Sequence, residues 1–144
     1  MARRLSNNTA FLLLFVAIVN FATSLADKHV HVVNDILPIA PTLNIHCKSK
    51  DDDLGEQALS PRKEFNWSFK DNIAGTTLFW CAMNWKDNNG KTLDQSFDVY
   101  KSSIVCTTDC WWSARVDGIY FYDENQRNFV RQYVWNTSIR RPLL

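Results

Sequence analysis

Apolar and polar residues alternate along most of the chain after residue 27, the pattern of β-strands with one buried face. In the clearest segment, Phe65, Trp67 and Phe69 alternate with Asn66 and Ser68, which predicts an antiparallel strand that is solvated on one side. Seven further segments have strand character: 30–33, 43–48, 76–85, 97–101, 110–116, 119–122 and 129–135. No segment after residue 26 keeps a helical period, so we expect an all-β domain.

The segment 76–85 differs from the others because it is apolar on both faces, which predicts a central strand. Asn89-Gly90 follows it and predicts a tight hairpin, with 97–101 as the return strand. Asp117-Gly118 predicts a second tight turn. Short strands with turns between them indicate a small antiparallel β-sandwich of about seven or eight strands. The six tryptophans all lie after residue 66 and can fill the space between two sheets.

The first 26 residues have the three parts of a secretory signal peptide. Arg3 and Arg4 precede a short apolar run over 11–19, and Ser24 and Ala26 provide small residues at an exit site. The apolar run is shorter than the roughly 20 residues that span a bilayer, so an uncleaved anchor is the weaker alternative. We expect cleavage after Ala26, which leaves residues 27–144 as one secreted domain.

Removal of the leader lowers the number of basic residues from 16 to 14 and leaves the 15 acidic residues in place. Such a balance lacks the basic excess that nucleic-acid binding requires. It also argues against an antimicrobial or toxin-like protein, which would more naturally be strongly cationic. The charge therefore argues against nucleic-acid binding, while the leader with its short apolar run predicts an extracellular protein that is not embedded in a membrane.

The four cysteines all lie in the predicted domain, and an even number in a small secreted chain indicates two disulfides. Zinc is the alternative, but no Cys-x-x-Cys pair or His-x₃₋₅-His partner is present. The hairpin argument predicts that Cys81 pairs with Cys106, because the return strand comes back beside the strand of Cys81. Cys110 then remains for Cys47. A Cys106–Cys110 bridge would close only a small loop and constrain the unfolded chain less.

The segment 48–55 breaks the alternation with two lysines, three aspartates and a glycine, so it predicts a charged loop at the rim of the domain. Calcium binding is one interpretation, but three consecutive aspartates lack the alternating ligand positions of an EF-hand. Solvated aspartates that cap backbone N–H groups and pair with Lys48 and Lys50 are another. Recognition of a partner is the third. The residues expected to contact a partner are Lys48, Lys50, Asp51, Asp52, Asp53, Asp87, Asn88 and Asn89.

Other candidate sites are weaker. Asn66 and Asn136 each begin an Asn-x-Ser/Thr sequon and are candidate glycosylation sites. His29 and His31 alternate in the first predicted strand and could form a weak metal site, although ordinary strand histidines are the better interpretation. No nucleophile motif surrounds any serine, and disulfide pairing leaves no free thiol. The sequence therefore predicts no enzyme, no resident metal and no cofactor.

The chain resembles the plant self-incompatibility protein family, the S-protein homologues. Matching segments cover most of the predicted domain: Cys47-Lys-Ser-Lys-Asp-Asp-Asp-Leu-Gly55, Val32-x-Asn34-Asp35, Phe65-x-Trp67-x-Phe69, Thr77-Leu-Phe-Trp-Cys81, Cys110-x-Trp112, Asp117-Gly-Ile-Tyr120 and Trp135. Residues 60–64 depart from the family pattern, in which a glycine commonly precedes the aromatic strand.

The resemblance implies a secreted, non-enzymatic plant β-sandwich with two disulfides. It also implies an extracellular ligand that is recognised by a membrane receptor on a partner cell. Pollen–pistil self-incompatibility is one option for its role. We expect a monomer. The alternative is a secreted carbohydrate- or lipid-binding or defence module. That alternative would be favoured if Trp80, Trp85 or Trp111 were exposed in a patch.

Overall fold

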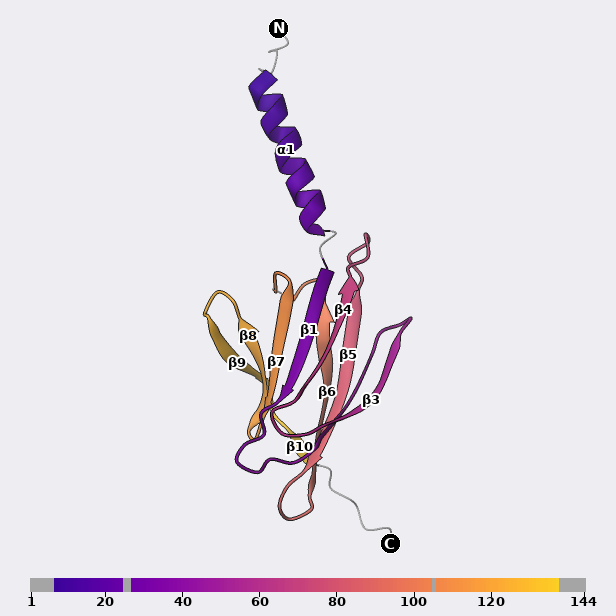
Figure 1. Ribbon diagram of the computed structural model, residues 1–144, viewed down its shortest axis with the longest axis vertical. Coiled ribbons are helices and arrows are strands. Elements are labelled where there is room, and N and C mark those ends of the chain that lie inside the picture. The colour runs from indigo at the N-terminus through magenta and orange to yellow at the C-terminus, as the bar shows by residue number, and fades with distance from the viewer. Residues whose placement is uncertain (1–6, 25–26, 105, 138–144) are drawn as a thin grey trace.

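The computed structural model describes residues 7–24, 27–104 and 106–137. One helix precedes ten strands: α1 Asn7–Ser24, β1 Asp27–Asn34, β2 Leu43–Lys48, β3 Asp53–Leu59, β4 Glu64–Lys70, β5 Leu78–Lys86, β6 Thr92–Lys101, β7 Asp109–Arg115, β8 Gly118–Asp123, β9 Asn128–Tyr133 and β10 Asn136–Thr137. The strands form a β-sandwich, and the helix lies outside it (Figure 1).

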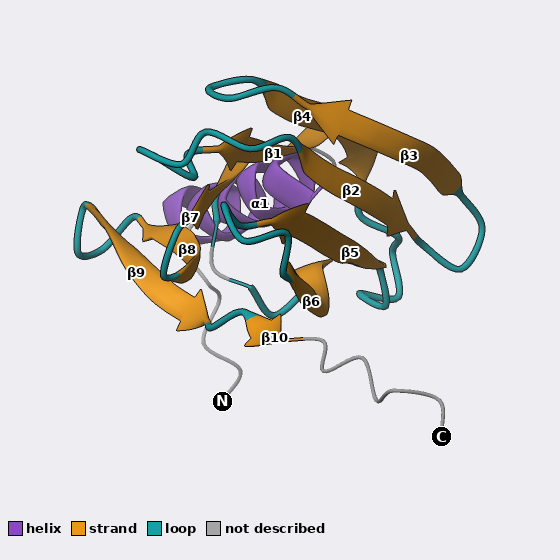
Figure 2. Cartoon of the chain, turned by 90° about the horizontal axis from the view of Figure 1, so that it is seen from below, coloured by secondary structure: helices purple, strands orange, loops and turns teal. Residues whose placement is uncertain are grey.

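The sandwich consists of two five-stranded sheets with the orders β4-β1-β7-β8-β9 and β10-β6-β5-β2-β3. Figure 2 shows the two layers from below. The all-β sandwich is thus confirmed, and β5 occupies the centre of its sheet as the apolar segment 76–85 predicts. One feature departs from a purely antiparallel sandwich, because β1 pairs with β7 in parallel.

The eight predicted strands are all present, and two more were missed. The residues of β3 are exposed or half-buried except for Leu59 at its end, because β3 is the edge strand of its sheet. It begins at Asp53, so the predicted loop 48–55 is shorter than expected and consists of residues 49–52. β10 has two residues and pairs with Leu93 and Asp94.

The core lies between the sheets and is rich in aromatic side chains. Trp85, Trp112 and Trp135 are buried in it, as predicted for the tryptophans. Trp85 and Trp135 meet edge to face with their ring centroids 6.0 Å apart. Trp80 and Trp111 are only half-buried and point to the outer faces of different sheets.

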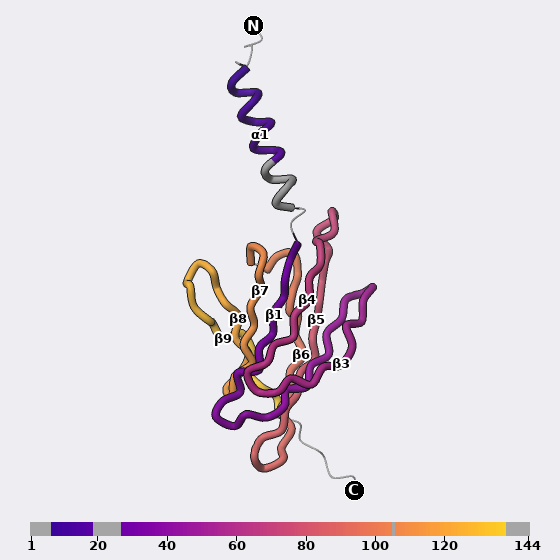
Figure 3. The backbone as a smooth tube through the Cα atoms, in the orientation of Figure 1, coloured from indigo at the N-terminus to yellow at the C-terminus, as the bar shows by residue number. Residues whose placement is uncertain are grey.

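The connections gather at two ends of the sandwich. We call the end at the start of β1 the upper rim; it comprises residues 49–52, 71–77, 106–108 and 124–127 (Figure 3). The opposite end is the lower rim and comprises residues 35–42, 60–63, 87–91 and 116–117. The register supports this division, because Asp27 at the start of β1 pairs with Lys70 at the end of β4.

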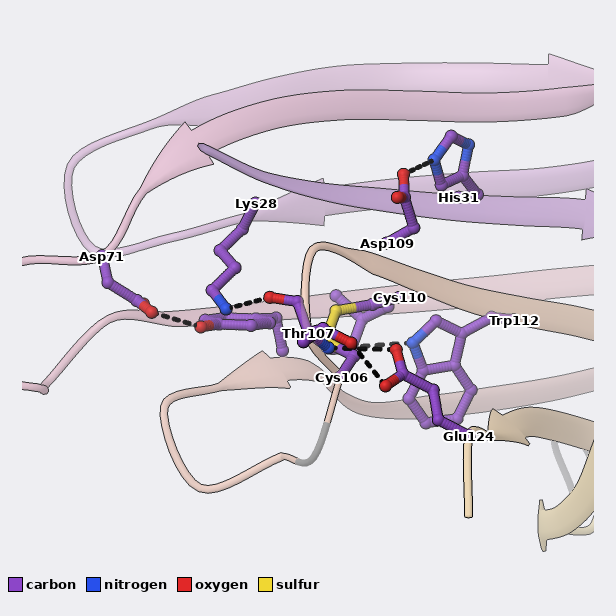
Figure 4. Close-up of a disulfide and its surroundings, with 11 residues drawn as sticks. Lys28, His31, Asp71, Cys106, Thr107, Asp109, Cys110, Trp112 and Glu124 are labelled. Carbon is purple, nitrogen blue, oxygen red and sulfur yellow. Dashed lines mark hydrogen bonds and ion pairs between the residues drawn. A yellow bond between two sulfur atoms is a disulfide. The ribbon is translucent and has the colours of Figure 1, made fainter. Parts of the chain in front are cut away.

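Both disulfides are present, but the predicted pairing is wrong. Cys47 bonds to Cys81, and Cys106 bonds to Cys110. The hairpin argument considered only the return strand β6 as a neighbour of Cys81. A central strand has two neighbours, and β2 on the other side places Cys47 directly opposite Cys81. Cys110 lies in β7 of the other sheet, so its partner is the nearby Cys106 (Figure 4).

The described side chains of α1, those of residues 7–18, lie outside the core. Its described apolar side chains, among them Phe11 and Ile18, are exposed to solvent. Among the described residues, no helix combines the length and apolar character needed to cross a membrane. Arg3, Arg4 and the expected cleavage site at Ala26 lie outside the described residues.

Candidate functional site

The acidic turn between β2 and β3 is a tightly bonded structure. The Ser49 N–H donates to the Asp52 carbonyl over 2.7 Å, which closes the turn. The Ser49 hydroxyl oxygen accepts from the Asp52 N–H over 3.0 Å. The backbone groups of the turn are therefore satisfied by Ser49, and neither Asp51 nor Asp52 needs its carboxylate to hold the turn.

The three aspartates have different surroundings. The Asp53 carboxylate lies 2.5 Å from His46 Nε2 and accepts from the Gly55 N–H over 2.9 Å. The contact with His46 is the main cause that holds the pKa of Asp53 below its usual value, and the hydrogen bond from the Gly55 N–H lowers it further. Asp51 and Asp52 are exposed and form no ion pair with any residue that the structure describes. Pairing with Lys48 or Lys50 is therefore not what holds the triplet; Asp53 is bound by a histidine instead.

A hollow with a volume of about 460 Å³ lies beside this turn. One wall is the turn itself, with Lys50, Asp51 and Asp52. The other wall is the loop between β4 and β5, and Trp80 also lines the space. Segments distant in sequence thus create a single concave surface that presents separate acidic and basic groups.

The β4–β5 loop is held rigidly by Asn72. Its side-chain oxygen accepts from the Thr76 N–H, its side-chain NH₂ donates to the Thr76 hydroxyl, and its N–H donates to the Thr77 hydroxyl, each over 2.8 Å. Asp71 anchors the loop to the sheet, because it accepts from the buried Tyr100 hydroxyl over 2.6 Å. Burial, followed by this contact with Asp71, raises the pKa of Tyr100.

Apolar side chains project from the same region. Ile73, at the tip of the β4–β5 loop, is 97% exposed, although the loop around it is well bonded. Leu78 is also exposed at the edge of the hollow. Apolar groups on a rigid loop beside unpaired charges are typical of surfaces that contact a partner.

The second predicted contact loop lies elsewhere. The Asp87-Asn88-Asn89-Gly90 turn is a tight hairpin as predicted, with Asp87 accepting from the N–H groups of Asn89 and Lys91. It stands at the lower rim, at the opposite end of β5 from the acidic turn. The two loops predicted to contact a partner therefore lie at opposite ends of the sandwich, and a partner contact by either loop stays a prediction. Periodicity locates turns, but only the pairing of β2 with β5 determines which turns share an end.

The remaining candidates are spread over the surface. Asn66 is exposed on β4, as the polar face of the strand predicts, and Asn136 is exposed on β10; glycosylation of either remains a prediction. His29 and His31 do not converge on a metal ligand set: His29 contacts Ser68, and His31 contacts Asp109. Among the described residues, no three His, Cys, Asp or Glu side chains are grouped to hold a metal ion.

At the upper rim, the segment before β7 is bonded to the β8–β9 loop and to β1. Thr107 donates from its N–H and its hydroxyl to Glu124, over 3.0 and 2.5 Å, and these bonds lower the pKa of Glu124 (Figure 4). Lys28 donates to the Thr107 carbonyl. Sequence reasoning missed the contact between Thr107 and Glu124, because neither residue belongs to a motif.

Fold, disulfides and rim loops define a small disulfide-bonded β-sandwich that displays loops from a rigid frame. A family model, the plant self-incompatibility protein S1, matches residues 29–135. The chain belongs to this family of plant self-incompatibility proteins. It is 36% identical to S-protein homolog 3 of Arabidopsis thaliana over 124 residues, covering 85% of this chain and 79% of that protein.

Two further comparisons agree with the family. S-protein homolog 1 of Arabidopsis thaliana is 38% identical over 115 residues, covering 79% of this chain and 75% of the relative. A solved structure of a self-incompatibility protein homologue superposes with a TM-score of 0.57 at 25% identity, covering 77% of this chain and 96% of that one. It represents a widespread family of small, highly stable, secreted proteins from plants.

Proposed function

We propose that this protein is exported and acts outside the cell as a non-enzymatic ligand for a membrane receptor on a partner cell. The upper-rim hollow is the contact surface. Self-incompatibility between pollen and pistil is one setting in which such a ligand would act. The carrying observation is that rigid loops surround the hollow, while Asp51, Asp52 and Ile73 remain available to a partner.

Export is supported by the arrangement of the leader. A helix whose described apolar side chains lie outside the core can be removed without loss of packing. N-terminal sequencing of protein recovered from the medium should begin at Asp27. Recovery of cell-associated protein that still carries Met1 would contradict this part of the proposal.

The receptor proposal is tested with labelled protein covering residues 27–144 and intact cells of the tissue that it meets. Wild-type protein should bind saturably, and protease treatment of the cell surface should abolish the binding. The variant D51N/D52N/I73S should lose at least about tenfold in affinity, because an apolar contact and two charge contacts each contribute on the order of a kilocalorie per mole.

A matched control at the lower rim is N88S/N89S, which changes exposed side chains away from the hollow. It should bind as the wild type does. Equal binding by the upper-rim variant, or loss of binding by the lower-rim variant alone, would overturn the assignment of the contact surface. Binding that resists protease treatment would overturn the protein receptor.

The alternative of a carbohydrate- or lipid-binding module requires tryptophans exposed together. Trp85 is buried, while Trp80 and Trp111 are half-buried on the outer faces of different sheets. The three residues therefore share no patch, and a protein partner at the upper rim is the function that we propose.

A further inference from the structure

A second concavity lies at one corner of the sandwich, between β6 of one sheet and β8 and β9 of the other. β10 pairs only with Leu93 and Asp94, so within the described chain the outer edge of β6 has no strand partner from residue 95 onward. The two sheets therefore stay open along this part of their border. The opening leads to a pocket of about 290 Å³ that shares no lining residue with the upper-rim hollow.

The floor of the pocket is aromatic. Trp112, Phe121 and Tyr133 line it, and Ile104 contributes an aliphatic wall. The ring centroids of Trp112 and Phe121 are 4.8 Å apart, and those of Trp112 and Tyr133 are 6.3 Å apart. Phe121 and Tyr133 are only partly buried although they pack against the core. Their accessible parts give an apolar guest rings on which to pack.

The pocket is preformed. Trp112 is 3% exposed, and its indole N–H donates to the Val99 carbonyl of β6 over 3.0 Å. This bond crosses from one sheet to the other and fixes the orientation of the indole ring. The ring of Phe97 packs against this indole ring, with the two ring centroids 4.9 Å apart. A guest would therefore enter without ordering the floor, which reduces the entropic cost of binding.

The mouth carries one acid and one base. Asp98, Lys101 and Gln132 line it. Neither Asp98 nor Lys101 forms an ion pair or a side-chain hydrogen bond with another described residue. Asp98 lines the same pocket as Tyr133, and the pKa of Tyr133 is raised mainly by burial and further by the charge of Asp98.

We propose that this corner pocket binds a small aromatic molecule whose head carries both an ammonium and a carboxylate group. The aromatic body rests on Trp112, Phe121 and Tyr133. The ammonium group pairs with Asp98 and the carboxylate with Lys101, which gives each free charge at the mouth a complementary partner. The volume is just below the range of about 300–1,000 Å³ for small-molecule sites, so the body is a single ring system.

Four probes with the same ring separate these contributions: L-tryptophan carries both charges, tryptamine only the ammonium, indole-3-propionate only the carboxylate, and indole neither. Calorimetric titration of the protein should give L-tryptophan the highest affinity. Each single-charge probe should bind about tenfold more weakly, the usual value of one charge-assisted contact, and indole should bind most weakly. Chemical-shift changes should centre on Ile104, Phe121 and Gln132.

Variants assign each contact. D98N should remove the advantage of L-tryptophan over indole-3-propionate, and K101M should remove its advantage over tryptamine. K86M, an exposed lysine at the far end of β5, is the matched control and should leave every affinity unchanged. Q132W should occlude the mouth and abolish binding without a change in melting temperature, because Gln132 is exposed.

Failure of all four probes to bind saturably would overturn the proposal. Equal affinity of indole and L-tryptophan would overturn the zwitterionic head. Undiminished binding by Q132W would place the binding elsewhere and would equally overturn the pocket. The cell-binding assay of the upper rim is independent of these results, so failure of one proposal is distinguishable from failure of the other.

Discussion

The two rims of the sandwich are stiffened by different means. At the upper rim, both disulfides and bonds within or between loops hold the connections, as in the Asn72 network. At the lower rim, a fully buried amide does so: Asn34 donates from its side chain to the carbonyls of Pro41 and Leu59 over 2.8 and 2.9 Å. Its oxygen accepts from the Ile36 N–H over 3.3 Å.

The difference shows which polar side chains stay free of internal hydrogen bonds and can contact a partner. The buried amide of Asn34 is consumed internally, and Asp35 likewise accepts from the Ser113 hydroxyl over 2.7 Å. At the upper rim Asp71 and Asn72 are consumed in the same way, but Ser49 holds the turn between β2 and β3, so Asp51 and Asp52 stay exposed. Residues of the same chemical type thus serve the fold at some positions and remain available for contacts at others.

The largest effect is expected from the disulfide that joins β2 to β5. Replacing Cys47 and Cys81 by alanine opens a loop with a sequence separation of 34, which should lower the free energy of unfolding by about 4 kcal/mol. The same change at Cys106 and Cys110, with a separation of 4, should cost about 2 kcal/mol. Denaturant titration measures both values, and a larger loss at the short loop would contradict this account.

Asn34→Ala should destabilise the domain by about 3 kcal/mol, because it removes three hydrogen bonds and leaves buried carbonyls unsatisfied. Asn88→Ala, at an exposed position of the same rim, is the control and should stay within about 0.5 kcal/mol of the wild type. If Asn34→Ala were equally mild, the lower rim would not depend on its buried amide. Thermal unfolding of the three proteins decides the matter.

Arg62→Gly should stabilise the lower rim by about 1 kcal/mol. Arg62 has a φ of 65°, the left-handed region that disfavours residues with a side chain. Its N–H still donates to the Asn34 carbonyl over 2.8 Å, so the backbone contact survives the change. A loss of stability would show that the arginine side chain has a structural role.

The variant D51N/D52N should leave the free energy of unfolding within about 0.5 kcal/mol of the wild type, since the backbone of the turn is held by Ser49. Asp51 and Asp52 are exposed and take part in no ion pair within the described residues. Chemical denaturation tests this directly. Marked destabilisation would mean that Asp51 or Asp52 also helps to hold the turn.

The smallest expected effect is a local response to acid at Asp53. Its pKa is held below the usual 3.8, so its contact with Gly55 stabilises the turn above that pH and is lost as the pH falls through the lowered value. The amide resonance of Gly55 should therefore titrate with a midpoint below 3.8. The His46→Gln variant should move the midpoint upward, and an unmoved midpoint would contradict the role of His46.

The sequence predicted the strands and turns of this molecule better than it predicted which strands lie next to one another. Alternation identifies which residues face the core, so β4, β5 and the hairpin at Gly90 were found at their places. Alternation does not say which strand lies beside which, and the disulfide pairing and the separation of the two turns both depend on β2 lying beside β5. β3 was missed because it is an edge strand with only one buried residue, so it shows no clear alternation. The corner pocket was missed because its strand residues come from β6, β7, β8 and β9, and the sequence does not show that these strands meet.

The place of β1 has a consequence for the order of folding. β1 is the first strand of the chain, yet it lies between β4 and β7, and His29 pairs with Asp109. Its sheet cannot close until the chain has been made nearly to its end. The other sheet draws four of its five strands from residues 43–101, so it can assemble earlier. Because distant pairings are slow to form, pulse-labelled hydrogen exchange during refolding should protect β5 before β1. Equal protection times for the two strands would exclude such an order.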